Sequence, residues 1–167
     1  MSDLLPGPDG LPRCRMHVDR LGRGELVAAL GGLLLGVCLF VAWYETDPGN
    51  PNAEIDGVSG ALSGFEVHQI LRWLLLLAAI APFILVWIVV RDHELSWPRG
   101  EMTAVAAIAA FGLIAYVGLL DRPGQPGGAI SLQLGYYGAL LGSILMVVGG
   151  AMSAGRTERT RKPPGVL

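Results

Sequence analysis

Charge is missing from four long stretches of this chain, and this absence limits what the protein can do. No Asp, Glu, Lys, Arg or His lies in the central part of any of these stretches. Ionisable side chains inside a bilayer are costly, and where they occur they mark ion pathways, proton relays and intramembrane active sites. Their absence weighs against a proton-coupled transporter, an intramembrane protease and a channel for charged ions.

Cysteine, histidine and familiar catalytic motifs are also scarce. The chain has two cysteines in 167 residues, Cys14 in a polar segment and Cys38 in an apolar one, so we expect no disulfide framework. His93-Glu94 does not begin an H-E-x-x-H motif, because no second histidine follows. The sequence contains no phosphate-binding loop and no nucleophile elbow. We therefore predict no catalytic residue, no cofactor and no metal ion. Because the chain has so few cations, we also predict no nucleic-acid partner.

What remains is apolar sequence of the length that a bilayer requires. An α-helix needs about 20 residues to cross the hydrocarbon core. We expect membrane spans over about residues 25–44, 66–90, 101–120 and 131–154, with an outer loop at 45–65. The predicted fold is all-α: an integral membrane four-helix bundle over 25–154. A disordered cytoplasmic segment, 1–24, precedes it, and a basic cytoplasmic tail, 155–167, follows it.

Positive charge predicts how the spans are oriented. Ten of the twelve Lys and Arg residues lie in the N-terminal segment, in the loop between the second and third spans, and in the tail. The positive-inside rule assigns these parts to the cytoplasm. We predict a multi-pass protein of a bacterial inner membrane, with both termini cytoplasmic and the first and third loops outside.

Small residues indicate how the spans pack. Helices in lipid associate where small side chains let their backbones approach closely. Gly32 and Gly36 are four apart in the first span, and Gly138, Gly142 and Gly150 lie on one line of the fourth. We interpret these five glycines as helix-packing positions. The fourth span uses them either within the chain or to contact a protein partner or a second copy.

Aromatic and charged residues meet at the outer ends of the first two spans. Six residues make up this candidate outer-interface cluster: Trp43, Tyr44, Phe65, Glu66, His68 and Arg72. On a continuous helix His68 and Arg72 would share one face, because they are four residues apart. The simplest role of the cluster is to anchor helix ends at the membrane interface. An alternative is a cation site formed by His68, Glu66 and the acidic residues of the loop.

Four segments resemble a known group of proteins: RLGRGELVAALGG, FVAWYET, SGFEVHQILRW and LGYYGALLGSILMVVGGAMSAGR. They are similar to small four-span membrane proteins of high-GC Gram-positive bacteria, a group without an assigned activity. Ala42 stands where that group has proline, and Phe65 where it has tryptophan. The resemblance implies topology and localisation only.

The function expected from these features is association. We expect a non-enzymatic membrane protein that serves as an accessory, scaffold or envelope-organising subunit. Its partners would be membrane lipid and either another protein or a second copy. One alternative is a small oligomeric transporter or pore lined by the fourth span. Another is an outer-interface enzyme that uses His68 and loop carboxylates.

Overall fold

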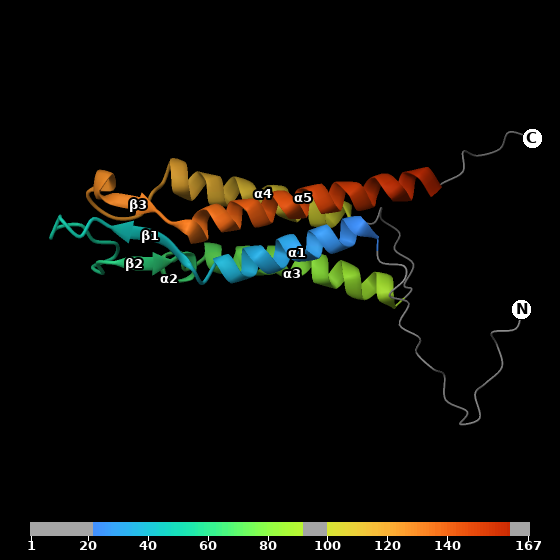
Figure 1. Cartoon of the computed structure of the whole chain (residues 1–167), viewed down its shortest axis with the longest axis horizontal. Coiled ribbons are helices and arrows are strands. Elements are labelled where there is room, and N and C mark those ends of the chain that lie inside the picture. Colours follow the sequence, from blue (N-terminus) through green and yellow to red (C-terminus); the bar gives the residue numbers. More distant parts are fainter. Residues whose placement is uncertain (1–21, 92–99, 161–167) are drawn as a thin grey trace, which may run out of the picture.

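Four long helices run side by side, each antiparallel to the next along the chain (Figure 1). The structure is a computed structural model that describes residues 22–91 and 100–160. The predicted segment 1–24 and tail 155–167 therefore lie largely outside the described residues. The long helices are α1 (Arg23–Cys38), α3 (Leu71–Val90), α4 (Glu101–Leu119) and α5 (Leu134–Thr160). We call the end of the bundle that carries the strands the sheet end.

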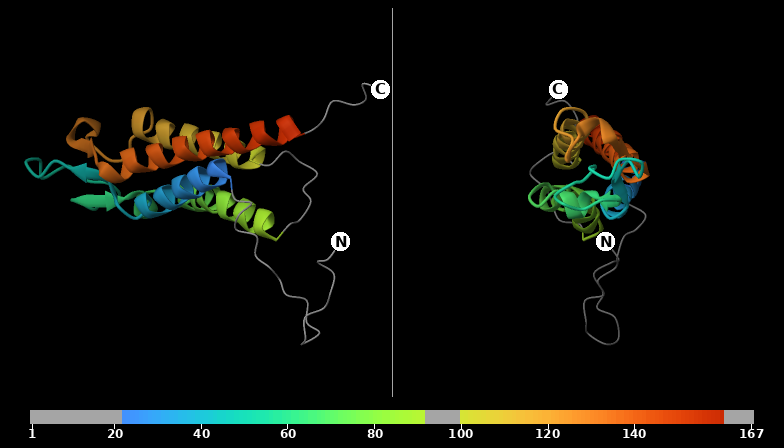
Figure 2. Two further views of the ribbon diagram at one scale, coloured as in Figure 1. Left: turned by 45° about the vertical axis from the view of Figure 1, so that its right-hand side comes forward. Right: turned by 90° about the vertical axis from the view of Figure 1, so that its left-hand side faces the viewer.

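The helices are arranged in the order α1, α5, α4, α3 around the bundle (Figure 2). The pair α1 and α5 makes the most extensive contact, and the pair α3 and α4 makes the least extensive of the four neighbouring pairs. The first and last helices of the chain are thus the closest neighbours.

Within the part of the chain that the structure describes, three helices are long and apolar enough to cross a membrane: Leu71–Val90, Glu101–Leu119 and Leu134–Gly155. Helix α1 has 16 residues, about 24 Å at the usual rise per residue, and is shorter than a typical span. The prediction that the first span is helical to residue 44 was wrong. The helix ends at Cys38, and β1 follows at Ala42–Thr46.

A three-stranded antiparallel sheet corrects the all-α prediction to a mostly helical fold. The strands β1 (Ala42–Thr46), β2 (Ala61–Ser63) and β3 (Ile130–Leu132) lie in the order β2-β1-β3. Tyr44 of β1 lies opposite Leu62 of β2 and Leu132 of β3. Strand β3 and Gln133 occupy the start of the predicted fourth span, so α5 begins at Leu134 rather than at 131.

The two connections at the sheet end form one unit, which we call the cap (residues 42–63 and 121–132). Glu54 and Gln125 exchange both main-chain hydrogen bonds, at 3.1 and 3.0 Å. Ile55 is 1 % exposed and packs in the core with Ile130. The guanidinium of Arg122 joins the cap to α4, because it donates to the carbonyls of Gly118 and Ile130 at 3.2 Å. The cap also contains the short 3-10 helix η2 (Gly127–Ala129).

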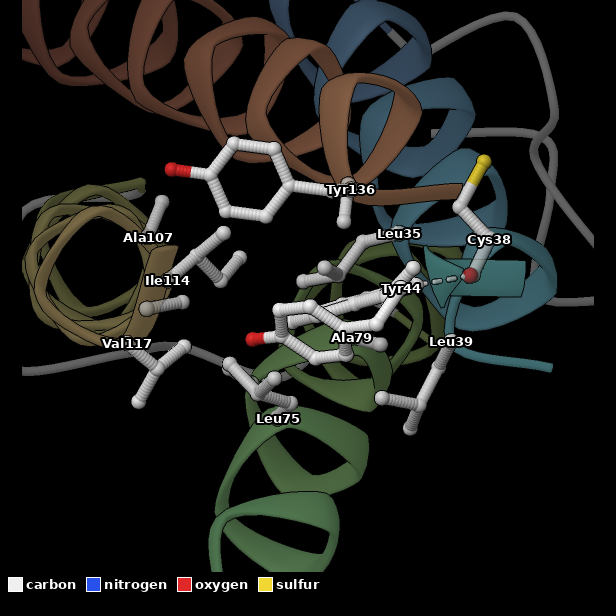
Figure 3. Packing of buried hydrophobic residues seen from close by; sticks show 14 of the residues in the cluster. Leu35, Cys38, Leu39, Tyr44, Leu75, Ala79, Ala107, Ile114, Val117 and Tyr136 are labelled. Atoms are coloured by element: carbon white, nitrogen blue, oxygen red, sulfur yellow. Dashed lines mark hydrogen bonds between the residues drawn. The ribbon is translucent and has the colours of Figure 1, made fainter. Parts of the chain in front are cut away.

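Beneath the cap, large side chains fill the sheet end of the bundle. Tyr44 from β1 and Tyr136 from α5 lie among Leu35, Leu75 and Ile114 (Figure 3). Tyr44 is 0 % exposed and Tyr136 is 2 % exposed. The two rings pack against both the strands and the helices, and this contact fixes the cap on the helices.

The predicted second span, 66–90, is also broken near its start. A short helix, α2 (Gly64–Val67), precedes α3, and His68 between them has extended dihedrals, φ −109° and ψ 92°. His68 and Arg72 therefore do not share the face of one continuous helix, as the spacing had predicted. A break at this position turns His68 toward β1 rather than along the helix surface.

Candidate functional site

The six predicted cluster residues divide into two groups that face different surroundings. Trp43, Tyr44 and His68 contact one another inside the protein. Phe65 and Arg72 contact each other further out. The Glu66 carboxylate accepts hydrogen bonds from Ser63 and contacts neither group. The six residues come from β1, α2, α3 and the break between the helices.

Trp43 is held in a socket made by two glycines. A methyl group on Gly64 would lie 2.5 Å from the Trp43 ring, and one on Gly135 would lie 2.8 Å from it. The indole Nε1–H donates to the Cys38 carbonyl at 2.7 Å. The ring also meets Tyr136 edge to face, with centroids 5.9 Å apart. Trp43 therefore joins the end of α1 to α2 and to the start of α5.

Tyr44 and His68 form a hydrogen-bonded pair beside Trp43. The Tyr44 hydroxyl lies 3.0 Å from the His68 Nε2. Burial raises the pKa of Tyr44. Burial also lowers the pKa of His68, an effect that Asp121 and Asp56 partly oppose. Both shifts favour neutral side chains, so the pair is a polar contact between uncharged groups at the sheet end of the bundle.

Arg72 lies over a pair of aromatic rings on the outside of the bundle. Its guanidinium carbon is 4.9 Å from the Phe65 ring centroid and 5.5 Å from that of Trp73. Phe40, at the end of α1, stacks on Phe65 with a centroid distance of 4.8 Å. The guanidinium donates to the Phe65 carbonyl at 3.5 Å, and its buried Nε has no hydrogen-bond partner.

Glu66 and Ser63 form a capping box that starts α2. The Glu66 carboxylate accepts from the Ser63 backbone N–H at 2.9 Å and from its hydroxyl at 2.7 Å, while the Ser63 hydroxyl accepts from the Glu66 N–H. These hydrogen bonds lower the pKa of Glu66. Both carboxylate bonds go to one oxygen, Oε2, and the capping box accounts for the position of this side chain.

The predicted packing glycines differ in what they contact. A methyl group on Gly142 would lie 2.7 Å from the Leu35 backbone N of α1, and one on Gly150 would lie 2.8 Å from the Gly100 carbonyl oxygen at the start of α4. Gly138 meets the Cys38 sulfur of α1, and Gly32 meets the Ala79 carbonyl of α3. A methyl group on Gly36 would lie 3.8 Å from the Ala79 Cβ, an ordinary contact.

Sequence reasoning missed several residues that complete these groups. It did not assign Tyr136, Trp73 or Phe40 to the cluster, nor Gly64 and Gly135 to the socket of Trp43. Except for Trp73, which is next to Arg72, these residues have partners far away in the sequence, so no local spacing reveals them. The S-x-x-E pattern from Ser63 to Glu66 was the one local signal available, because it is the signature of a capping box.

Within residues 22–91 and 100–160, no three His, Cys, Asp or Glu side chains gather closely enough to hold a metal ion. The predictions that concern metal and cofactor remain predictions.

Known proteins add no constraint. No family model matches the chain, and neither a curated protein nor a solved structure matches it.

Proposed function

We propose that this chain is a four-pass protein of the cell membrane with both termini in the cytoplasm, and that it acts by association. Helix α1, the first of the chain, supplies the one pass that the three longer apolar helices do not account for. An exposed apolar stripe runs along α1 and continues into the turn after it: Leu26, Leu30, Leu33, Val37 and Phe40. A stripe of this kind is suited to lipid, and residues 39–41, which follow the helix, extend its apolar stretch toward the thickness of the bilayer.

The observation that carries the proposal is the cap. A helical bundle needs only short turns to connect its helices. Here two connections from different parts of the chain pair with each other and close the sheet end. The cap is therefore an ordered surface beyond what connecting the helices requires, and such a surface suits an accessory or scaffold subunit.

The chemistry of the cap favours a partner that carries positive charge. Its rim has five acidic side chains: Glu45, Asp47, Glu54, Asp56 and Asp121. A shallow pocket of about 330 Å³ lies between residues 45–48 and 128–131. Arg122, the cation of the cap, is occupied by main-chain carbonyls. Opposite charges across an interface steer encounter and select partners, so we propose that a basic protein surface docks on this rim.

An outer-interface enzyme has less support than association. His68 packs against Trp43 and hydrogen-bonds Tyr44, and the Glu66 carboxylate accepts from Ser63. Both candidate groups therefore have positions explained by local structure. A pore lined by the small residues of α5 also has less support, because Gly142 meets α1 and Gly150 meets α4.

Native mass spectrometry from mild detergent tests the association. The informative variant is Asp47→Lys with Glu54→Lys, because both side chains are exposed, whereas the Glu45 carboxylate accepts from the Gln133 side chain. The matched control is Glu101→Lys, at the opposite end of the bundle. We expect a partner at fixed stoichiometry that is lost with the cap variant, retained with the control and rebound from purified components. A homo-oligomer without a partner, or binding that ignores the cap variant, would contradict the proposal.

A further inference from the structure

Arg72 occupies an unusual position for a cation. It is the second residue of α3, one of the three helices with the length and composition of a membrane span. Its neighbours Ile70 and Trp73 are 78 % and 56 % exposed, and Leu77 one turn further is 67 % exposed. Trp and Tyr prefer the level of the lipid headgroups. Arg72 therefore lies where an apolar, lipid-facing surface begins.

Among residues 22–91 and 100–160, no carboxylate forms an ion pair with the Arg72 guanidinium. Arginine has five N–H donors and no acceptor. One donor reaches the Phe65 carbonyl at 3.5 Å, while the buried Nε has no partner. The nearest acid in the sequence, Glu66, is already bonded to Ser63 through Oε2. A partly buried cation without a counter-charge is costly unless something outside the chain supplies one.

The surrounding rings shape the place where such an anion would bind. The guanidinium lies over the Phe65 and Trp73 rings, which themselves meet edge to face with centroids 6.1 Å apart, and Phe40 extends the apolar wall. Stacking on aromatic rings orients the guanidinium, and its planar fork matches the oxygens of a phosphate. The exposed rings of Phe40 and Trp73 present apolar surface on which acyl chains can lie.

We propose that Arg72, Phe65, Trp73 and Phe40 form a binding site for the phosphodiester headgroup of a membrane phospholipid. The guanidinium binds the phosphate oxygens, and the three rings contact the glycerol backbone and the first carbons of the acyl chains. The occupant is a lipid of the leaflet that surrounds the sheet end. This site does not depend on whether the cap binds a protein.

Competition between two lipids tests the site in the purified full chain. The probes are a phosphatidylglycerol and a galactolipid with the same acyl chains but no phosphate, followed by native mass spectrometry. We expect the wild-type protein to retain the phosphatidylglycerol about tenfold better, the scale of a charge-assisted hydrogen bond. Arg72→Gln should remove that preference. Gln69→Ala, an exposed neighbour in the same connection, should keep it.

Further variants and a second probe keep the result interpretable. Arg72→Lys keeps the charge without the stacked plane, and Trp73→Leu keeps the arginine without one ring. Each should give an intermediate loss even if Arg72→Gln fails to fold. Equal retention of the two lipids, or an unchanged preference in Arg72→Gln, would overturn the proposal. Displacement of the phospholipid by inorganic phosphate would also overturn it, because the site would then hold a free anion.

Discussion

Two regions of the molecule hold α1 and α5 together, and they do so by opposite means. Along the helices, which we call the seam, glycines bring one backbone against the other: a methyl group on Gly31 would lie 2.6 Å from the Gly142 carbonyl oxygen, and one on Gly149 would lie 2.6 Å from the Gly24 carbonyl oxygen. At the sheet end, Trp43 and Tyr136 fill the space between the elements with large rings. The seam therefore depends on the absence of side chains, whereas the sheet end depends on the volume of large ones.

The difference determines how each region responds to change. Added volume harms the seam, because neither backbone can move aside without separating the helices. Lost volume harms the sheet end, because removing a ring leaves a cavity. The same bundle is therefore sensitive to substitution in opposite directions at its middle and at its end.

The largest expected effect on stability follows from removing the Trp43 side chain from its socket. Trp43→Ala should lower the free energy of unfolding by about 3–5 kcal/mol, the range for large-to-small changes at buried aromatic sites. The matched control is Trp73→Ala, because Trp73 is 56 % exposed and its loss should cost well under half as much. Thermal unfolding in detergent, followed by tryptophan fluorescence or circular dichroism, measures both. Similar losses in the two variants would mean that Trp43 is not buried between the cap and the helices.

Filling the seam should have the next largest effect. Gly142→Ala places a methyl group 2.7 Å from the Leu35 backbone N, and we expect a loss of about 1–3 kcal/mol in the free energy of unfolding. Gly112→Ala is the control, since a methyl group there meets nothing within 4 Å and alanine favours helix by up to about 1 kcal/mol. If both variants unfold at the same temperature, the close approach of α1 and α5 is not correct.

Removing the capping box should have a smaller effect, confined to the start of α2. Ser63→Ala removes the hydroxyl that accepts from the Glu66 N–H, and a lost N-cap costs about 1 kcal/mol. Because the Glu66 pKa is lowered from 4.5, the stabilising contribution of its carboxylate is complete above that pH and is lost as the pH falls below it. Ser63→Thr preserves the hydroxyl and should restore most of the stability. Equal unfolding temperatures for Ser63→Ala and wild type at neutral pH would exclude a stabilising role.

The smallest expected effect is a pH dependence from His68. Burial lowers its pKa in the folded protein, so the unfolded chain binds more protons as the pH falls through about 6.5. Stability should therefore be highest above that pH and decrease below it. His68→Gln should flatten the curve of unfolding temperature against pH in this range. A variant whose curve keeps the slope of the wild-type curve would show that another group is responsible.

The sequence predicted the helices better than it predicted the cap, and the reason lies in the range of the interactions. The length of an apolar run and the spacing of small residues are local features of the sequence. They are enough to predict α4 and a packing role for Gly142. The sequence pattern pointed to glycines four residues apart, whereas the seam contacts repeat every seven residues, from Gly24 to Gly31 and from Gly142 to Gly149. A repeat of seven is expected of helices that pack in a left-handed supercoil.

The strands could not be found in the same way. Strand β3 is three residues long and pairs with a segment far away in the sequence, so it carries no periodic signal. The apolar run that includes Trp43 reads as helix on composition alone. The pairing of Tyr44 with Leu132 and the main-chain hydrogen bond from Gln133 to the Trp43 carbonyl make it a strand. The same non-local contacts place Trp43 and Tyr44 inside the protein, so the division of the cluster into buried and outer groups could not be predicted from the sequence either.

The central claim is that the two connections at the sheet end form one cap and, as we propose, that this cap lies outside the membrane. A disulfide tests it most directly. Glu54 and Gln125 exchange both main-chain hydrogen bonds, a pairing that puts Cα atoms about 5.5 Å apart, within the range of a disulfide. Glu54→Cys with Gln125→Cys, in a chain with Cys14→Ala and Cys38→Ala, should form an intramolecular disulfide when whole cells are oxidised. A membrane-impermeant maleimide added first should prevent it. No disulfide, one only between chains, or one that the maleimide does not block would contradict the account.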